Sequence, residues 1–189
     1  FGFSLVQLDA RQESTRHSEA IAELLTRNPS NPDYNALPEK ERQKILCEYI
    51  NNEPLTTNTR SLSPNTAETI EVFKVMAHMR KEISPKTFGS YVISMTHNAS
   101  HVLEVLFLAR QTGLAGRDSS GKYFCHIQPS PLFETIEDLQ ASTKIMDDYL
   151  SHPVVMNSLK YQSERAKSDI LYQDVMIGYS DSNKDGGIL

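Results

Sequence analysis

The sequence is poor in cysteine and has no excess of basic residues. Only Cys47 and Cys125 occur among 189 residues, without framework spacing or a CxxC pair, so a reducing, cytoplasmic location is expected. Nineteen Lys and Arg against 24 Asp and Glu give a formal net charge of −5, which argues against binding of nucleic acid or an anionic membrane. Any site for an anion must therefore be built locally from a few placed cations.

Long apolar runs, a signal peptide, internal repeats and low-complexity tracts are also missing from the sequence. No apolar run approaches the roughly 20 residues of a membrane span. The composition, with 39% hydrophobic and 23% charged residues, is that of an ordinary globular protein. Its length suits one hydrophobic core, or part of a larger one.

Short strand-like segments alternate along the sequence with longer segments of helical periodicity. The strand-like segments are rich in β-branched and aromatic residues, and they lie at 3–9, 90–95, 123–128 and 174–180. Helical patterns occupy 18–27, 38–50, 66–83, 100–114, 133–150 and 158–173. Because strands separated by long helices pair in parallel, the sequence predicts a helix-rich α/β fold.

Local signals refine this pattern at a few positions. Ser18 is a possible helix cap, and Gly113 is expected to stop the helix that precedes it. The 100–114 pattern is apolar on most sides, so this helix should be deeply buried. The polar, glycine-containing stretch 112–124 is expected to be a loop.

Charged clusters follow three of the four predicted strands at their carboxyl ends. The clusters read DARQESTRH (9–17), PSPLFETIEDL (129–139) and SDSNKDGG (180–187). In parallel α/β barrels the active site is assembled from the loops at this end of the strands. The positions of the clusters therefore predict one shared site at the carboxyl edge of a parallel sheet.

The first two clusters allow a functional and a purely structural interpretation. Arg11 could bind phosphate or carboxylate oxygens through its planar guanidinium, or it could form surface ion pairs with Glu13 beside Arg16 at a helix entrance. Glu134 could be a site carboxylate, or it could cap the helix expected from about Thr135, where the helix dipole favours acids.

The third cluster is the most specific of the three. Asp181 is expected to end a buried strand, Lys184 follows three residues later, and Gly186 and Gly187 would let the backbone pass close to a ligand. A carboxylate at this position can hold a hard divalent cation, and the ammonium group can neutralise an anionic substrate. The histidines at 17, 97, 101 and 126 share no zinc-type spacing and are expected at the surface or in the core.

The same cluster also fits the front of an EF-hand calcium loop. Asp181, Asn183 and Asp185 would stand at positions one, three and five, and Gly186 at position six. Two features count against a calcium-binding module at 181–189. The incoming segment has strand rather than helix character, and the glutamate at position twelve would be residue 192, beyond the sequence.

Four segments, in the same order, resemble phosphoenolpyruvate carboxylase. VMIGYSDSNKDGG (175–187) is similar to the lysine signature of that family, and LDARQESTRHSEAIAELL, YVISM and SPLFETIEDL resemble further family segments. The resemblance extends over nearly the whole chain. One departure follows YVISM: the family often has a lysine-containing stretch near KTPSD, whereas this chain continues THNASHV.

The resemblance implies a parallel (β/α)8-type barrel with many extra helices, and a reaction of phosphoenolpyruvate with bicarbonate that gives oxaloacetate and phosphate and replenishes the tricarboxylic acid cycle. It implies Mg²⁺ or Mn²⁺ bound by Glu134 and Asp181. Arg11 would bind phosphate, and Lys184 would be the signature lysine. The implied parent enzyme is a cytoplasmic homotetramer with four-carbon acid effectors.

The chain is expected to be one partial domain, 1–189, from the centre of the larger barrel. It begins without an initiator methionine, and it lacks the upstream TAHPT segment of the family. Four strands of an eight-stranded barrel leave open edges, so the chain alone is expected to be inactive. Another magnesium-dependent barrel lyase that acts on a pyruvate-type enolate remains an alternative function.

Overall fold

The computed structural model describes residues 7–55 and 61–186. The strands are β1 (Leu8–Glu13), β2 (Phe88–Ser94), β3 (Ala115–Arg117), β4 (Tyr123–Cys125), β5 (Gln128–Phe133) and β6 (Met176–Ile177). The α-helices are α1 (Ser14–Thr26), α2 (Glu39–Asn51), α3 (Pro64–Glu82), α4 (Ala99–Thr112), α5 (Ile136–Leu150), α6 (Pro153–Ala166) and α7 (Tyr179–Gly186). A short 3₁₀ helix, Tyr34–Ala36, precedes α2.

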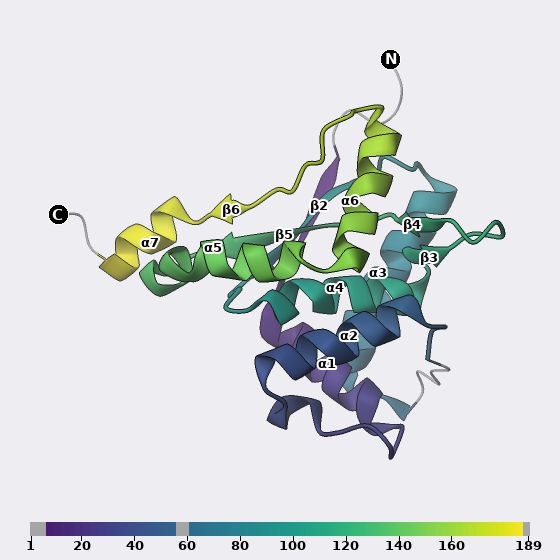
Figure 1. The fold of residues 1–189 in the computed structure, drawn as a ribbon, viewed down its shortest axis with the longest axis horizontal. Helices are drawn as coiled ribbons and strands as arrows, with labels where there is room; N and C mark the ends of the chain where they lie inside the picture. Colours follow the sequence, from purple (N-terminus) through teal and green to yellow (C-terminus); the bar gives the residue numbers. More distant parts are fainter. Residues whose placement is uncertain (1–6, 56–60, 187–189) are drawn as a thin grey trace.

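A parallel four-stranded sheet is the framework of the fold, as the sequence predicted. Its strand order is β1-β2-β5-β6, and each neighbouring pair is parallel. The register places Arg11 beside Val92, and Val92 beside Ser130. Because all four strands run in one direction, their carboxyl ends share one edge of the sheet, which lies toward α7 in Figure 1. The four strands do not make a full (β/α)8 barrel in the described residues.

The first strand differs in extent from the predicted segment 3–9. Residues 1–6 lie outside the described part of the chain, and β1 continues through Asp9, Arg11 and Glu13. The pairing with β2 holds this polar segment in the sheet, because the register continues to Glu13 beside Ser94. Arg11 therefore lies within a strand rather than in a loop after it.

The strand predicted at 123–128 forms only at Tyr123–Cys125, outside the main sheet, and the loop predicted at 112–124 is the rest of a hairpin. Tyr123–Cys125 pairs antiparallel with Ala115–Arg117 in a separate hairpin, whose turn the side chain of Asp118 stabilises. The strand of the main sheet is β5, which contains Pro129 and Pro131. Prolines two residues apart lose their N–H donors on the same side of a strand, so the other side can still pair.

The end of the described chain is also different from the prediction. Only Met176 and Ile177 of the strand-like segment 174–180 pair with β5, and both are exposed. The chain then turns at Gly178 and forms α7, with Asp181 in its first turn. Asp181 therefore lies at the start of a helix, whereas the sequence predicted the end of a buried strand.

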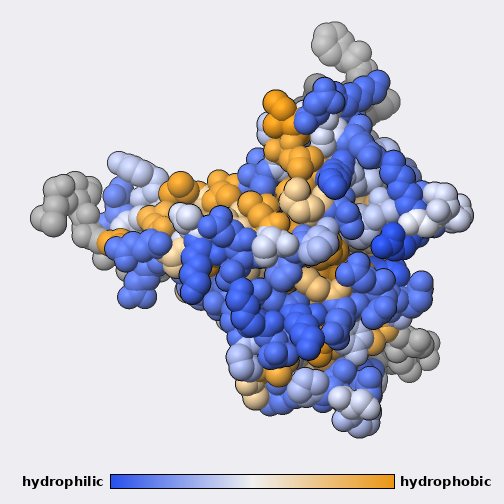
Figure 2. Space-filling view, viewed as in Figure 1, coloured by the Kyte–Doolittle hydropathy of each residue, from blue (hydrophilic) through white to orange (hydrophobic). Residues whose placement is uncertain are grey.

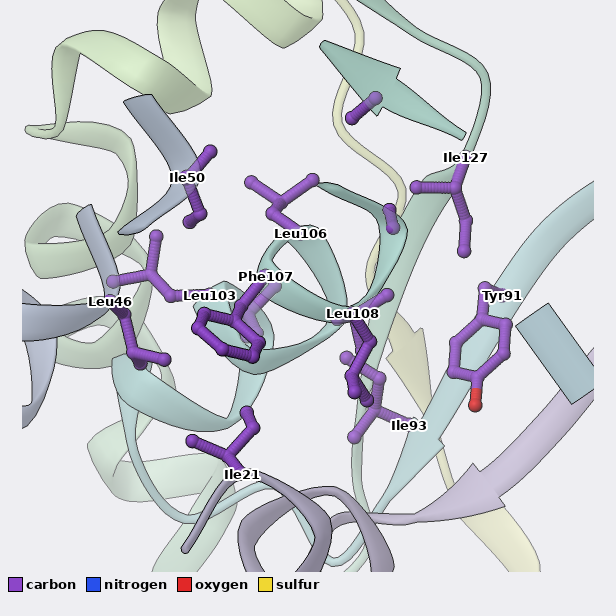
Figure 3. Close-up of a cluster of buried hydrophobic side chains, with 14 of the residues drawn as sticks. Ile21, Leu46, Ile50, Tyr91, Ile93, Leu103, Leu106, Phe107, Leu108 and Ile127 are labelled. Carbon is purple, nitrogen blue, oxygen red and sulfur yellow. The ribbon is translucent and has the colours of Figure 1, made fainter. Parts of the chain in front are cut away.

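Helix α4 is the centre of the hydrophobic core, as its apolar sequence predicted. Its residues 99–109 are all buried, and it contacts α1, α2, α3, α5 and β5. Figure 3 shows Leu103, Leu106 and Phe107 surrounded by side chains of α1, α2 and β2. A fully buried side chain of this kind contributes about 1.5–3 kcal/mol. Gly113, in the left-handed conformation at φ 81°, ends the helix as expected.

Two predicted helix boundaries are corrected by tertiary contacts. Ser18 is not a cap, because α1 begins at Ser14 and the Ser18 hydroxyl donates to buried Glu104. The helix predicted at 158–173 is α6, which begins five residues earlier at Pro153. It ends at Ala166, where Lys167 takes a left-handed conformation.

An exposed apolar strip follows the outer edge of the sheet. It comprises residues before β6 and in β6, and Figure 2 shows hydrophobic side chains along this border of the molecule. The exposed members are Ile170, Leu171, Tyr172, Val175, Met176 and Ile177. In the described residues, no helix combines the length and the apolar character that a membrane crossing needs.

Candidate active site

Arg11 and Glu134 meet at the carboxyl edge of the sheet, although they are far apart in the sequence. Arg11 lies on β1 and Glu134 directly follows β5, with β2 between the two strands. The guanidinium Nη2 donates to Glu134 Oε1 over 2.7 Å. The Glu134 side chain is 13% exposed and that of Arg11 is 57% exposed, so the pair opens to solvent on the arginine side.

The pairing decides between the two interpretations of Glu134. The cap of α5 is Thr135, whose side chain accepts a hydrogen bond from the backbone N–H of Asp138. Glu134 lies one residue before this cap and directs its carboxylate to Arg11. It is therefore available as a site carboxylate, and the helix needs no capping from it.

Asp181 lies close to Glu134 across the turn at Gly178. An ideal Cβ atom built on Gly178 would be 3.3 Å from Asp181 Oδ2 and 3.3 Å from Glu134 Cγ, so these two atoms lie within twice that distance of each other. The Gly178 N–H donates to Phe133 O at 3.0 Å, and the Ser182 hydroxyl donates to Glu134 O at 2.7 Å. These hydrogen bonds hold the start of α7 against the end of β5.

The Glu134 and Asp181 carboxylates offer the oxygen ligands that a hard divalent cation prefers. Arg11 occupies one oxygen of Glu134, which leaves the second oxygen and the Asp181 carboxylate as donors. Mg²⁺ is commonly bound by one or two carboxylates, with water and substrate oxygens completing its shell. No cluster of three or more His, Cys, Asp or Glu residues suited to a metal occurs in 7–55 and 61–186. Water, substrate or further protein groups would thus supply the other ligands.

Lys184 is on the same helix as Asp181 but does not join the other candidates. It lies in the last turn of α7, three residues after Asp181, and it is exposed. Residues three apart lie on one side of a helix, so Lys184 and Asp181 belong to the same face of α7. Among the described residues it forms no ion pair.

The helical conformation of Tyr179–Gly186 argues against the calcium-loop alternative. An EF-hand would need an open loop from Asp181 through Gly186, with the backbone turning around the ion. Here the same residues form α7 instead of an open loop. Gly187, the other member of the glycine pair, lies outside the described residues.

Glu13 and Arg16 take part in surface interactions, away from the Arg11–Glu134 pair. Arg16 Nη2 contacts Glu68 Oε2 of α3 at 2.8 Å, and Glu13 accepts a hydrogen bond from Thr15. Both residues thus have surface roles, but the expected ion pairs within the cluster are not found among the described residues. Arg11 is the member of this cluster that contacts Glu134.

A His97–Asp138 pair follows β2 and was missed by the sequence patterns. His97 Nδ1 lies 2.6 Å from Asp138 Oδ1, and Asp138 Oδ2 is buried with no hydrogen-bond partner among the described residues. Asp138 is in the first turn of α5, four residues after Glu134. A carboxylate that orients an imidazole in this way can support proton transfer or anion binding. The departure THNASHV is the sequence signal that marks this position.

The other histidines and the cysteines belong to the core or its margins. Burial, followed by the charge of His101, lowers the pKa of His17 to about 3, and the His17 ring lies 2.8 Å from the Tyr91 hydroxyl. Burial lowers the pKa of His101 to about 4. Cys47 and Cys125 are both free thiols.

Comparison with known proteins agrees with the pattern of these residues. The family model described as phosphoenolpyruvate carboxylase matches residues 1–189. The chain is 42% identical to phosphoenolpyruvate carboxylase of Rhodothermus marinus over 194 residues, which cover 99% of this chain and 20% of that protein. It is 40% identical to the protein of the same name from Prochlorococcus marinus (strain MIT 9301), covering 100% of this chain and 19% of the relative.

The chain spans about a fifth of the length of these curated relatives. The enzyme of the same name from Parasynechococcus marenigrum (strain WH8102) is 42% identical, again over the whole chain and 18% of that protein. The match covers all four strands of the sheet and the residues at their carboxyl edge. The chain therefore belongs to the phosphoenolpyruvate carboxylase family.

Proposed function

We propose that this chain is the part of a phosphoenolpyruvate carboxylase that carries metal-binding and phosphate-binding groups of the active site. The whole enzyme would join phosphoenolpyruvate and bicarbonate to give oxaloacetate and phosphate. The convergence of Arg11, Glu134 and Asp181 at one edge of the sheet carries this proposal. Family membership supports the same reaction.

Arg11 is the proposed phosphate-binding residue. Its guanidinium offers several parallel N–H donors, which suit phosphoryl oxygens better than a single ammonium does. One terminal nitrogen is engaged by Glu134, and the exposed side of the group is open to solvent. The carboxylate thus orients the arginine, and the remaining donors can spread the charge of a phosphoryl group during its transfer.

Glu134 and Asp181 are the proposed ligands of Mg²⁺ or Mn²⁺. The bound ion would supply Lewis-acid stabilisation of negative charge on the enol oxygen. Glu134 would be shared between the ion and Arg11, which fixes the phosphate-binding group next to the metal-binding group. Lys184, one turn after Asp181, would contribute a further positive charge for the anionic substrate.

The reaction proposed for the parent enzyme has two stages, phosphoryl transfer and then carboxylation. A bicarbonate oxygen attacks phosphorus, and the bond between phosphorus and the enol oxygen breaks, which gives carboxyphosphate and an enolate. The methylene carbon of the enolate then forms a bond to the carboxyl carbon, and phosphate leaves. Arg11 holds the phosphoryl oxygens during the first stage, and the neighbouring positive groups stabilise the enolate.

The surroundings of this site in the parent enzyme are part of the same proposal. Residues 1–189 would be one section of a closed parallel barrel, with the exposed strip along β6 covered by the next section. We further propose a cytoplasmic homotetramer, on the basis of the family resemblance.

Substitution of Arg11 in the full-length enzyme tests the proposal. Arg11→Gln should lower kcat/KM for phosphoenolpyruvate by about 100-fold or more, because a charge-assisted phosphate contact is lost from the transition state. Arg16→Gln is the matched control, since Arg16 pairs with Glu68 on the surface. Bicarbonate-dependent release of oxaloacetate is the measured quantity. If the Arg11→Gln and Arg16→Gln enzymes had the same kcat/KM, Arg11 would not be a phosphate-binding residue. Turnover without bicarbonate would favour another enolate lyase.

A further inference from the structure

A polar cavity lies at the opposite end of the sheet from the candidate active site. It has a volume of about 350 Å³ and opens between the amino ends of β1, β2 and β5 and the last turns of α3 and α6. The last turns of these two helices lie in the upper part of Figure 1. We call it the amino-end pocket, and its lining includes Arg80, Lys86, His126, Gln128, Arg165 and Tyr172.

The charged groups that line the amino-end pocket are all of one sign. Arg80 comes from α3, Lys86 from the turn before β2, and Arg165 from α6. None of the described residues that line the pocket is acidic. No ion pair within the described ranges includes any of these three cations. In a chain with a net charge of −5, three converging cations without a carboxylate are a local departure from the overall balance.

The donors of these cations are only partly used within the described chain. Arg80 Nη1 donates to the backbone carbonyl of Pro85, which fixes the guanidinium at the pocket wall. The Arg165 guanidinium lies 5.8 Å from the centre of the Tyr161 ring, a cation–π contact that leaves its N–H groups free for other acceptors. The guanidinium groups are thus positioned by neutral partners rather than neutralised by acids.

The pKa values of two half-buried groups of the pocket, Arg80 and His126, are lowered partly by the neighbouring positive charges. Burial, followed by the charge of Arg165, lowers the pKa of Arg80. Burial, followed by Arg80 and Arg165, lowers the pKa of His126 to about 4, so this imidazole is neutral at physiological pH. Its Nδ1 lies 3.0 Å from the Tyr161 hydroxyl. Arg80 and Arg165 therefore both act on His126, and each arginine disfavours the charge of the other.

Helix-dipole compensation explains only part of this arrangement. Basic residues are favoured in the last turn of a helix, and both Arg80 and Arg165 occupy such positions. That effect acts on each helix separately and falls off within one turn. It does not account for Lys86, which is in a turn, or for the convergence of all three cations on one cavity.

We propose that the amino-end pocket binds the phosphate group of a small metabolite, or inorganic phosphate itself, at a site separate from the active site. Two guanidinium groups and one ammonium group match the charge and the oxygen geometry of a phosphate dianion. The cavity accommodates a phosphate and a small attached group. The site requires none of Arg11, Glu134 and Asp181, so its occupancy is independent of the proposed carboxylation.

Binding of labelled inorganic phosphate to the full-length enzyme tests the proposal. The Arg11→Gln enzyme serves as the background, because phosphate also binds at the proposed active site. Equilibrium dialysis should then still detect one site per chain. Adding Arg165→Gln should weaken this binding about tenfold or more, whereas Arg165→Lys should keep part of it. Lys81→Gln is the matched control: Lys81 is in the same last turn of α3 as Arg80, outside the pocket.

The remaining outcomes separate the ligand classes and the two proposals. Sulfate and small phosphomonoesters should displace the label, and succinate should displace it at least tenfold less well. Absence of a site in the Arg11→Gln background, or an Arg165→Gln enzyme that binds phosphate like the Lys81→Gln enzyme, would overturn the pocket assignment. The two proposals can also fail separately. If the full-length protein made no oxaloacetate but lost phosphate binding through Arg165→Gln, the pocket would be supported and the proposed function would be refuted.

Discussion

The carboxylates of this chain differ in burial, and their burial determines which of them can bind a cation. Asp181 is exposed, and Glu134 faces a guanidinium at the edge of the sheet. Glu104 is fully buried on α4 and accepts hydrogen bonds from the Tyr34 and Ser18 hydroxyls. Burial raises the pKa of Glu104 to about 8, so its neutral form is favoured near pH 7. The first two carboxylates can bind a cation, and Glu104 is a structural hydrogen-bonding group.

The raised pKa of Glu104 predicts a loss of stability as the pH rises. Between the ordinary glutamate value near 4.5 and about 8, the folded state keeps a proton that the unfolded state releases. Folding is therefore weakened as the pH rises through this window. In the full-length enzyme, Glu104→Gln should flatten the fall in Tm between pH 5 and 8, by roughly 5 °C relative to wild type.

A matched control separates this effect from a general change in charge. Glu71→Gln alters an exposed carboxylate of α3 and should leave the pH dependence of Tm unchanged. Differential scanning fluorimetry across the pH range gives both curves. A Glu104→Gln enzyme whose Tm falls with pH as steeply as wild type would show that Glu104 is ionised in the fold.

The residues at the site were predictable to different degrees for physical reasons. Arg11, Glu134 and Asp181 follow or overlap segments with strand character, and a position of this kind can be recognised in the sequence itself. The His97–Asp138 pair depends on β2 lying beside β5, which no local pattern encodes. The sequence also left open whether Glu134 caps α5, and the structure shows that Thr135 is the cap and that Glu134 contacts Arg11.

At the scale of elements, the turn between β6 and α7 decides the geometry of the candidate metal site. Gly178 joins the two elements, and a Cβ atom at this position would contact both Asp181 and Glu134. The Ser182 N–H donates to Gly178 O at 2.8 Å, so the first turn of α7 forms directly after the strand. The absence of a side chain at residue 178 is what allows Glu134 and Asp181 to approach each other.

Gly178→Ala should therefore weaken metal binding without unfolding the protein. The new methyl group would lie 3.3 Å from both neighbours, tighter than ordinary contact, so the carboxylates must move apart by a few tenths of an ångström. We expect the activation constant for Mn²⁺ in the full-length enzyme to rise about tenfold. Gly113→Ala is the control, since it strains a left-handed helix end far from the site, lowers Tm and leaves the activation constant unchanged. Equal activation constants for both variants would refute the close approach at Gly178.

The sequence predicted the helices better than the short strands. The helix from 99 to 112 has a long apolar pattern and a glycine stop, and both signals were interpreted correctly. Strand β5 contains two prolines, which oppose a strand assignment locally, and its pairing with β2 overrides them. Helix α7 carries glycine and several polar residues, so its formation depends on contacts with the end of β5 rather than on propensity.

At the scale of the whole molecule, both edge strands of the sheet, β1 and β6, lack a further strand partner among the described residues. The outer strand β6 is two residues long and exposed, and the apolar strip beside it faces outward. On the other side, β1 is an edge strand with exposed polar side chains. Parallel sheets are normally covered on both faces or closed into a barrel. The parallel core was predictable from the order of elements, and the described residues do not close it into a barrel.

The open borders predict that the isolated 189-residue chain makes no oxaloacetate. The full-length enzyme under the same conditions is the control, because in the proposed account it would supply the remaining barrel and active-site groups. A coupled assay with phosphoenolpyruvate, bicarbonate and Mg²⁺ measures the product. Turnover by the isolated chain above the level of an Arg11→Gln version of that chain would contradict the account of an incomplete barrel.

The most direct test of the central claim is a double-mutant cycle on Mn²⁺ affinity in the full-length enzyme. If Glu134 and Asp181 bind one ion, Glu134→Gln and Asp181→Asn should each raise the Kd for Mn²⁺ by at least about tenfold, and the double variant should be far from additive. Glu137→Gln, an exposed acid three residues after Glu134, should bind Mn²⁺ like wild type. Kd values within twofold of wild type, or effects of the two substitutions that simply add, would contradict a shared ion.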